Sequence, residues 1–267
     1  MPELPEVQTV LEGFAAAIKD RTISGLECFY PGTVTWYGDA EEKAFPAKMT
    51  GYKRLGKYML VHLDSGYSLI IHLRMTGKLV AAPKSDEPLL HERARFSLRG
   101  GEVVHFIDPR TFGKIIVCVS DNVREHMPEL GMEPLDKDFT AKRLGEILAK
   151  KKAPIKTVLL DQRVIAGLGN IYVCEVLYRT GILPDTPACE LSAKKVAEIV
   201  KETVAVLEEA IKMGGTSISD FRRIDDKSGE FQHFLQVYQK EQCPKGHVVQ
   251  RSVMGGRGTF YCPICQK

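Results

Sequence analysis

The fold of the first half of the chain is decided by residues 58–73, which read YMLVHLDSGYSLIIHL. Apolar and polar residues alternate over 58–63 and over 68–73, and the polar Asp-Ser-Gly at 64–66 separates the two runs. Because alternation places successive side chains on opposite faces, each run predicts a half-buried strand, and the short turn joins them as a hairpin. Similar runs recur from residue 23 to 119, so this half is predicted to be an antiparallel β structure.

Helical periodicity flanks this β region. Apolar residues recur at helical spacing over 7–18, after Pro5, which suits a first helical turn, and beside Glu6, which complements the positive end of the dipole. The same period returns over 141–213, whereas 131–140 reads as a linker. The predicted fold class is therefore α+β with more than one domain.

Composition excludes several protein classes. The 267 residues include 37 Lys and Arg against 34 Asp and Glu, and the hydrophobic and charged shares of 44% and 27% are ordinary for globular domains. No run reaches the roughly 18 apolar residues of a membrane span, and the N-terminus lacks the features of a signal peptide. We expect a cytoplasmic protein with no membrane partner.

Basic and acidic segments alternate along the chain. Residues 48–79 and 141–164 each carry a net charge of +5, whereas residues 1–20 carry −3. This alternation suits a protein that binds a polyanion and performs carboxylate chemistry. Solvated strand and helix faces would give the same pattern, so charge alone leaves both interpretations open.

The C-terminal tail carries the most specific local chemistry. Cys243 and His247 are separated by three residues and Cys262 and Cys265 by two, with fourteen residues between the pairs. Ligands at this spacing converge on a tetrahedral Zn²⁺, which would fold a hairpin too small for its own core. The sequence predicts one structural zinc ion, against the alternative of incidental thiol pairs beside a surface histidine. The other cysteines are expected to be buried free thiols: Cys28, Cys118, Cys174 and Cys189.

Two further segments are typical of phosphate binding. Arg257 follows two glycines at the expected tip of the tail hairpin, where a rigid turn can present a cation to a phosphate. The Gly-Leu-Gly-Asn run at 167–170 precedes a helical stretch, and such glycines let backbone amides approach an anion. A helix-connecting turn without a ligand is the alternative for the second segment.

Motifs along the whole chain resemble those of the formamidopyrimidine-DNA glycosylase family. They are Pro-Glu-Leu-Pro-Glu-Val at 2–7, Arg-Leu-Gly-Lys-Tyr at 54–58, Asp-Pro-Arg-Thr-Phe-Gly at 108–113, Leu-Leu-Asp-Gln through Gly-Asn-Ile-Tyr at 159–172, and Gly-Arg-Gly-Thr in the tail. The resemblance implies excision of oxidised purines, such as 8-oxoguanine and formamidopyrimidines, from duplex DNA, followed by β,δ-elimination that cleaves the strand.

The resemblance also implies a domain organisation. An N-terminal antiparallel β-sandwich flanked by helices would span 1–130 and a linker 131–140. A helix-two-turn-helix DNA-binding domain with a lid loop would span 141–230, and a zinc finger 231–267. The DNA would be held in the cleft between domains.

The family's chemistry begins at the N-terminus. Removal of Met1 would leave the secondary amine of Pro2 as the nucleophile. α-Amino groups titrate near about 7.7–8.0, against about 10.4 for lysine, so more of the amine is unprotonated at neutral pH. Attack at the sugar C1′ would give an iminium ion, an electron sink that permits elimination of the 3′ and then the 5′ phosphate.

Four more residues match catalytic positions of the family. Glu3 would protonate the sugar ring oxygen, for which shielding must keep its carboxyl protonated. Glu6 would position groups or relay protons, although a first-turn Glu also complements the helix dipole. Lys57 matches the proton donor of the β-elimination, and Arg257 matches the zinc-finger arginine of the last elimination.

A nucleotide everted from the duplex leaves a gap that the protein must fill. Met75, Arg110 and Phe112 match the family's inserting residues, two apolar wedges and a cation that pairs with the orphaned base. Further matches are the DNA-contacting positions His91, Lys151 and Asn170 and a Gly-rich lid at 214–229. Three histidines match no family position and are interpreted as strand residues: His62, His72 and His105.

The tail departs from the family pattern, which has four cysteines in two Cys-x-x-Cys pairs. Here Gly246 or His247 stands where the second thiolate would be. Because imidazole is a competent zinc ligand, our hypothesis is a site with three cysteines and His247.

Two alternative functions stay open. The related endonuclease VIII activity on oxidised pyrimidines shares the Pro-Glu terminus and the zinc finger. A non-catalytic DNA-binding module on the same scaffold would keep Met1, which blocks the amine. The expected partner is double-stranded DNA, with oxidised bases for either enzyme, and we expect a monomer associated with the bacterial nucleoid.

Overall fold

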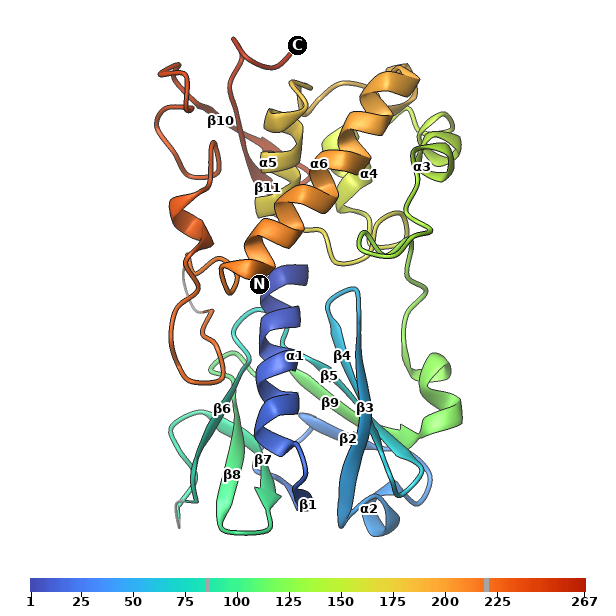
Figure 1. Ribbon diagram of the computed structural model, residues 1–267, viewed down its shortest axis with the longest axis vertical. Helices are drawn as coiled ribbons and strands as arrows, with labels where there is room; N and C mark the ends of the chain where they lie inside the picture. The colour runs from blue at the N-terminus through green and yellow to red at the C-terminus, as the bar shows by residue number, and fades with distance from the viewer. Residues whose placement is uncertain (85–86, 219–220) are drawn as a thin grey trace. The chain divides into compact units, whose positions relative to one another are not determined.

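The computed structural model describes residues 1–84, 87–218 and 221–267. The chain forms two compact units, one of Met1–Pro128 with Met213–Glu230 and one of Glu129–Lys212 with Phe231–Lys267 (Figure 1). The sequence-based division grouped Met213–Glu230 with the helical region, but in the structure this segment belongs to the first unit. It joins the first unit because Phe221 and Ile224 pack into that unit's core.

The strands of the first unit form one hydrogen-bonded sheet, in the order β2-β9-β5-β4-β3-β1-β7-β8-β6 among the residues described. The strands are β1 (Thr22–Cys28), β2 (Val34–Trp36), β3 (Ala47–Leu55), β4 (Tyr58–Leu63), β5 (Tyr67–His72), β6 (Lys78–Pro83), β7 (Glu92–Leu98), β8 (Glu102–Ile107) and β9 (Lys114–Val119). Neighbouring strands are antiparallel except β2 and β9, which pair in parallel at one edge. The predicted antiparallel structure is confirmed, with this one exception on a strand of three residues.

The hairpin predicted from residues 58–73 is β4 and β5. Met59 pairs with Ile71 and His62 with Ser68, so the alternating apolar residues of the two strands lie on the same face. Gly66 closes the turn at φ +85°, a conformation that glycine adopts without a steric penalty.

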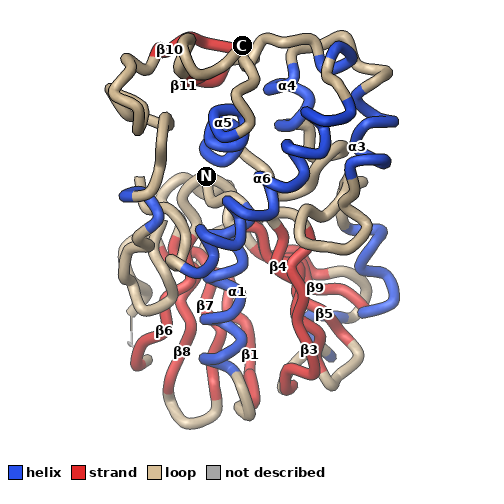
Figure 2. Tube along the Cα trace, turned by 45° about the horizontal axis from the view of Figure 1, so that its top comes forward, coloured by secondary structure: helices blue, strands red, loops and turns tan. Residues whose placement is uncertain are grey.

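The helix α1 (Leu4–Ile18) packs against β3 and β4 and against β6. Figure 2 shows β6 and β8 on one side of α1, and β3, β4, β5 and β9 on the other. The two halves of the sheet join through only two residue pairs between β1 and β3. The apolar positions predicted from the helical period are all buried in the core: Val7, Val10, Leu11, Phe14 and Ile18.

The second unit is helical and ends in a two-stranded hairpin. Its helices are α3 (Ala141–Leu148), α4 (Ile155–Leu160), α5 (Asn170–Arg179) and α6 (Ala193–Lys212), and its strands are β10 (Gln250–Met254) and β11 (Arg257–Tyr261). Shorter helices across the chain are α2 (Ala40–Lys43) and the 3-10 turns η1 (Ser120–His126), η2 (Ala188–Glu190) and η3 (Phe231–His233). The helix α5 packs against α4, α6 and β11, so it forms the centre of this unit.

A buried carboxylate attaches the tail to α5. Glu175 accepts hydrogen bonds from the backbone N–H groups of Gln236, Val237 and Tyr238 at 2.8, 3.0 and 2.9 Å. Burial raises the pKa of this carboxyl, although the three N–H donors oppose the shift. The chain is therefore fixed to the helix just before the Cys/His cluster.

Candidate active site and metal centre

The first turn of α1 is fixed by a reciprocal pair of carboxylates. Glu3 is the N-cap, its side chain accepts from the Glu6 backbone N–H, and Glu6 Oε2 accepts from the Glu3 backbone N–H at 2.8 Å. Pro2 and both glutamates are buried, whereas Met1 is 38% exposed. The structure thus places Pro2 and Glu3 together in a shielded position at the helix N-terminus.

Glu6 also connects α1 to the segment Met213–Glu230. Its second oxygen, Oε1, accepts from the backbone N–H of Thr216 at 2.7 Å. Gly215 adopts φ +84°, which strains any other residue, and a Cβ there would lie a tight 3.0 Å from Glu6 Oε1. The sequence predicted a catalytic or dipole role for Glu6, and the structure adds this structural contact.

Lys57 lies in the turn between β3 and β4 and is only 5% exposed. The pKa of the neighbouring His72 is lowered to about 3, because the imidazole is buried and because the charges of Arg74 and Lys57 disfavour its protonation. The imidazole also stands edge-on to Tyr58, with ring centroids 4.4 Å apart, and its Nδ1 accepts from the Arg74 backbone N–H at 2.9 Å. His72 was interpreted as an ordinary strand residue, and only the fold brings it close to Lys57.

A neutral His72 makes stability depend on pH. The pKa is about 3 in the folded chain and about 6.5 when unfolded, so the unfolded state takes up the proton first as pH falls. Stability from this group is complete above pH 6.5 and is lost progressively down to pH 3. Between pH 6.5 and 5 the wild type should lose about 2 kcal/mol more than His72→Asn, which keeps an acceptor for the Arg74 N–H.

Urea unfolding at several pH values measures this difference. The fluorescence of Trp36 reports on the first unit, because the chain's single tryptophan lies in β2. Equal pH dependence of wild type and variant would mean that His72 is not held neutral.

The three predicted inserting residues lie on two turns of the first unit. Met75 and Phe112 are 39% and 49% exposed, and Arg110 is also exposed. The Arg110 guanidinium stands 5.0 Å from the centroid of the Phe112 ring. These side chains therefore lie outside the core, and their insertion into a base stack stays a prediction.

The other predicted DNA contacts are found on both units. His91 is exposed at φ +63° in the first unit, and Lys151 is exposed between α3 and α4 in the second. Asn170 begins α5, and its Nδ2 donates to the Gly258 carbonyl at 2.8 Å, which ties the helix to β11. The neighbouring Gly167 N–H donates to a Gln162 side chain at 3.0 Å, so this amide already has a partner.

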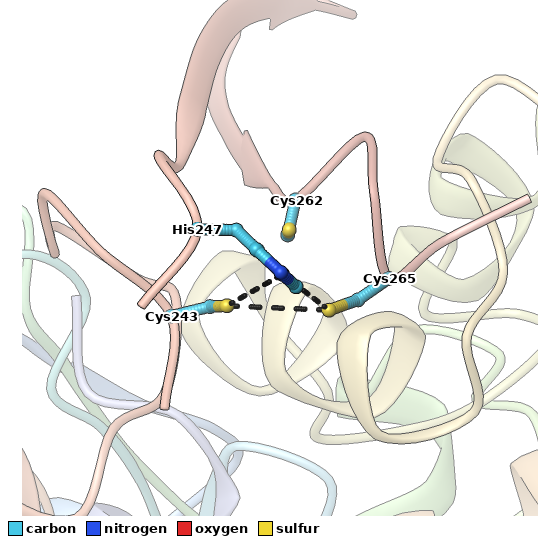
Figure 3. A group of neighbouring side chains, drawn as sticks. All are labelled: Cys243, His247, Cys262 and Cys265. Atoms are coloured by element: carbon cyan, nitrogen blue, oxygen red, sulfur yellow. Dashed lines mark hydrogen bonds between the residues drawn. The ribbon is translucent and has the colours of Figure 1, made fainter. Parts of the chain in front are cut away.

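Four side chains of the tail converge on one point. Ligand atoms of Cys243, His247, Cys262 and Cys265 all lie within 4.8 Å of one another (Figure 3). Cys243 Sγ stands 3.8 Å from His247 Nδ1 and 4.0 Å from Cys265 Sγ. Tetrahedral zinc with bonds of about 2.3 Å to sulfur would separate two thiolates by about 3.8 Å, so the cluster can hold one such ion.

The surroundings of Cys243 favour its thiolate form. Burial opposes ionisation, but hydrogen bonds from the Tyr178 hydroxyl and from the Lys245 and His247 backbone N–H groups lower the pKa of this thiol to about 6. The Tyr178 side chain belongs to α5 and packs with Cys174 and Cys262 in a small apolar cluster. The helix therefore supports the site both by packing and by hydrogen bonding.

Arg257 begins β11 directly after the Gly255-Gly256 turn, at φ +58° and +71°, and is exposed as predicted. The strand behind it is fixed by Lys156, whose buried Nζ donates to Thr259 Oγ1 at 2.8 Å. Burial lowers the pKa of Lys156. The hairpin tip thus presents a cation on a rigid base.

The free cysteines differ from the prediction in part. Cys118 and Cys174 are buried, as expected, but Cys28 and Cys189 are exposed, so the prediction was wrong for these two. Cys28 is the last residue of β1 and Cys189 lies in η2, where short elements at the surface leave the thiol uncovered.

Two family models match the chain. The model described as "Formamidopyrimidine-DNA glycosylase N-terminal domain" matches residues 1–115, and "Formamidopyrimidine-DNA glycosylase H2TH domain" matches residues 130–222. Curated proteins named formamidopyrimidine-DNA glycosylase are similar over the full length. The protein from Desulfitobacterium hafniense is 40% identical over 276 residues and that from Gluconobacter oxydans 38% over 278, each covering 100% of both chains.

Solved structures are similar in fold. A Lactococcus lactis FPG mutant in complex with Fapy-dG-containing DNA matches with a TM-score of 0.92 at 33% identity, covering 100% of both chains. Another mutant of that protein, in which Gly-His replaces a cysteine, in complex with THF-containing DNA, matches at 0.92 and 32% with the same coverage. The MUTM (FPG) protein of Thermus thermophilus matches at 0.89 and 34%, covering 99% of this chain and 98% of the other. These matches confirm the α+β fold class, and the chain belongs to the formamidopyrimidine-DNA glycosylase family.

Proposed function

We propose that this chain is a bifunctional DNA glycosylase and lyase that excises oxidised purines from duplex DNA and cleaves the strand by β,δ-elimination. The observation that carries the proposal is the shielded N-terminus of α1, where Pro2 and Glu3 are buried in the same unit as Lys57. Full-length relatives named for this activity, and solved relatives in complex with Fapy-dG-containing DNA, support it.

The chemistry follows from the residue types. Once Met1 is removed, the Pro2 nitrogen attacks C1′ as the C1′–base bond breaks, and the proton of the attacking amine passes to the departing base. Glu3 then delivers a proton to the ring oxygen as the sugar opens to the iminium ion. The iminium ion stays cationic without a proton and acidifies the C2′ hydrogen. Loss of that proton expels the 3′ phosphate, and a second elimination expels the 5′ phosphate. Lys57 and Arg257 supply proton transfer and phosphate binding in these steps.

Glu6 acts in this scheme as a positioning residue. Its two oxygens accept from the Glu3 and Thr216 backbone N–H groups, so it holds the catalytic turn and the predicted lid together. This contact fits the prediction that residues 214–229 form a lid. If the lid closed over a damaged base, movement at Thr216 would reach Glu3 through the hydrogen bonds of Glu6.

The predicted domains fit the same scheme. We place the catalytic domain at 1–130 and a linker at 131–140. The helix-two-turn-helix region then lies in 141–212 and the zinc finger at 231–267, because the segment 213–230 packs with the first unit and not with the helices. Duplex DNA with an oxidised base is the partner, and a monomer suffices because all proposed residues lie on one chain. In the part of the chain that the structure describes, no helix is long and apolar enough to cross a membrane.

Zinc fits the Cys/His cluster as a structural ion. Cys243, His247, Cys262 and Cys265 would be its ligands, and a closed four-ligand site leaves no position for water or substrate. The Gly246-His247 dipeptide of this chain parallels the Gly-His substitution of the Lactococcus lactis mutant. The ion would fold the hairpin that carries Arg257.

Borohydride reduction in the presence of an 8-oxoguanine duplex tests the proposal. The iminium should be reduced to a stable protein–DNA adduct of the processed chain. A parallel thymine glycol duplex separates the purine from the pyrimidine activity, and stronger cleavage of thymine glycol would favour the endonuclease VIII alternative. If the chain lacks Met1 and still forms no adduct, the enzymatic proposal would be wrong, and the non-catalytic DNA-binding module would be the better interpretation.

Arg257→Ala should weaken duplex binding uniformly and reduce the slope of log K against log salt by about 0.9, the amount expected for one lost phosphate contact. Binding titrations from low to moderate salt measure this slope. Arg251→Ala is the matched control, because Arg251 lies on β10 with its guanidinium 5.8 Å over the Phe260 ring. An unchanged slope in Arg257→Ala would remove this residue from the phosphate contacts.

A further inference from the structure

A buried carboxylate joins the turns that carry the proposed inserting residues. Asp108 follows the end of β8 and is 0% exposed. It begins the stretch 108–113, which includes Arg110 and Phe112, but the sequence assigned it no role. Because a fully buried carboxylate is costly unless its oxygens accept hydrogen bonds, the contacts of this side chain indicate why it is there.

The side chain of Asp108 spans two separate turns. Oδ1 accepts from the Thr76 hydroxyl and from the Arg110 backbone N–H, the latter at 3.2 Å. Oδ2 accepts from the Gly113 backbone N–H at 2.7 Å. One carboxylate therefore fixes the residue next to Met75 and both ends of the segment from Arg110 to Gly113.

The backbone of Asp108 extends this network to a third turn. Its N–H donates to the His91 carbonyl at 2.9 Å, and its carbonyl accepts from Arg93 Nε at 2.8 Å. The same carbonyl accepts from the Thr111 N–H at 3.3 Å, and Thr111 adopts φ +61°, a conformation uncommon for a residue with a branched Cβ. The surrounding contacts hold this residue in an unfavourable conformation.

The space around the carboxylate is closely fitted. A Cβ on Gly113 would lie 2.5 Å from the Phe106 ring and 3.1 Å from Asp108 Oδ2, so only glycine allows this approach. On the other turn, the Gly77 N–H donates to the Leu73 carbonyl at 3.0 Å and closes the loop around Met75. Hydrogen bonds close both turns, and the bond from Thr76 to Asp108 joins one to the other.

We propose that Asp108 is the positioning residue that sets Met75, Arg110 and Phe112 in one geometry for insertion into the base stack. This inference rests on the proposed function. Three side chains that enter one gap must arrive in register, because a displacement of about 1 Å in a functional constellation lowers its efficiency severely. A carboxylate suits the task because it accepts all three hydrogen bonds and donates none.

Two variants separate positioning from folding. Thr76→Val removes only the bond between the turns, and Thr76→Ser retains it. Asp108→Asn keeps the shape but places an NH₂ donor against an N–H donor. Single-turnover excision from an 8-oxoguanine duplex should fall about tenfold in Thr76→Val and about a hundredfold in Asp108→Asn, whereas Thr76→Ser should stay within about twofold of wild type.

The discriminating substrate is a single-stranded oligonucleotide with a preformed abasic site, which has no base stack to fill. Strand cleavage of this substrate should change less than about twofold in every variant, since Pro2 and Glu3 are untouched. Thermal unfolding followed through Trp36 checks the fold. If Asp108→Asn does not fold, the comparison of Thr76→Val with Thr76→Ser on the two substrates tests the inference.

Two results would overturn the inference alone: equal losses on both substrates, which indicate a general structural role, or full duplex activity in Thr76→Val and Asp108→Asn. A wild-type chain that neither excises 8-oxoguanine nor forms a borohydride adduct would instead overturn the proposed function, and the inference with it. The two failures are therefore distinguishable.

Discussion

Insertion of a glutamate between Met1 and Pro2 is expected to abolish borohydride capture of damaged DNA and to lower excision by roughly 10³-fold or more, the order found when a covalent nucleophile is removed from an enzyme. A large second residue prevents removal of Met1, so the imino nitrogen of Pro2 stays in a peptide bond. Intact mass verifies the unprocessed N-terminus, and gel separation of reduced adducts gives the readout.

Pro2→Gly is the informative companion variant. Its Met1 is still removed, and the new terminus is a primary amine that can form an imine. Capture should therefore persist at a reduced rate, because a primary amine gives a cation only when the imine is protonated. If the glutamate-inserted chain were captured as efficiently as wild type, the nucleophile would be another amine, and the role assigned to Pro2 would be wrong.

Loss of one predicted zinc ligand in the C-terminal tail should impair duplex binding almost as strongly as the glutamate insertion impairs excision. Cys262→Ser is expected to release the single equivalent of zinc and to weaken duplex binding at least about a hundredfold, because structural zinc contributes about 10–16 kcal/mol in small fingers. Among the described residues, the buried apolar cluster at this site has only Cys174, Tyr178 and Val237 besides the predicted ligands Cys243 and Cys262, so little other burial holds the tail together. Zinc content by elemental analysis and duplex titration measure the two effects.

The chain offers controls for this experiment. Cys189→Ser changes an exposed thiol outside the cluster and should leave zinc content and binding unchanged. His247→Cys should retain zinc as a four-thiolate site, whereas His247→Ala should lose affinity for the ion. Full zinc content at unchanged affinity in His247→Ala would show that His247 is not a ligand.

Much of the fold was predictable because its signals are local. The strand β4 was predicted with its observed bounds, since alternation and a polar turn define both of its ends. The tail cluster was equally predictable, because ligand spacing along the chain fixes which side chains converge. The parallel pairing of β2 with β9 was not, since three residues carry no readable period.

The rest of the site depends on contacts distant in sequence. Thr216 meets Glu6 across 210 residues, and Thr76 meets Asp108 across 32. No local pattern marks such partners, and His72 gives no sign in the sequence that Lys57 lies near it. The position of residues 213–230 likewise follows from two side chains, Phe221 and Ile224, that could equally have packed elsewhere.

The ends of the Met213–Glu230 segment meet, because the Glu230 N–H donates to the Met213 carbonyl at 3.0 Å. An excursion whose ends touch can be lengthened, shortened or exchanged without moving the chain on either side, and the entropy of closing it grows only slowly with its length. Variation in this segment is nevertheless limited at four positions, because Gly215 and Thr216 contact Glu6 and because Phe221 and Ile224 pack in the core of the first unit. Between these contacts the sequence can change while the catalytic turn keeps its hydrogen bonds.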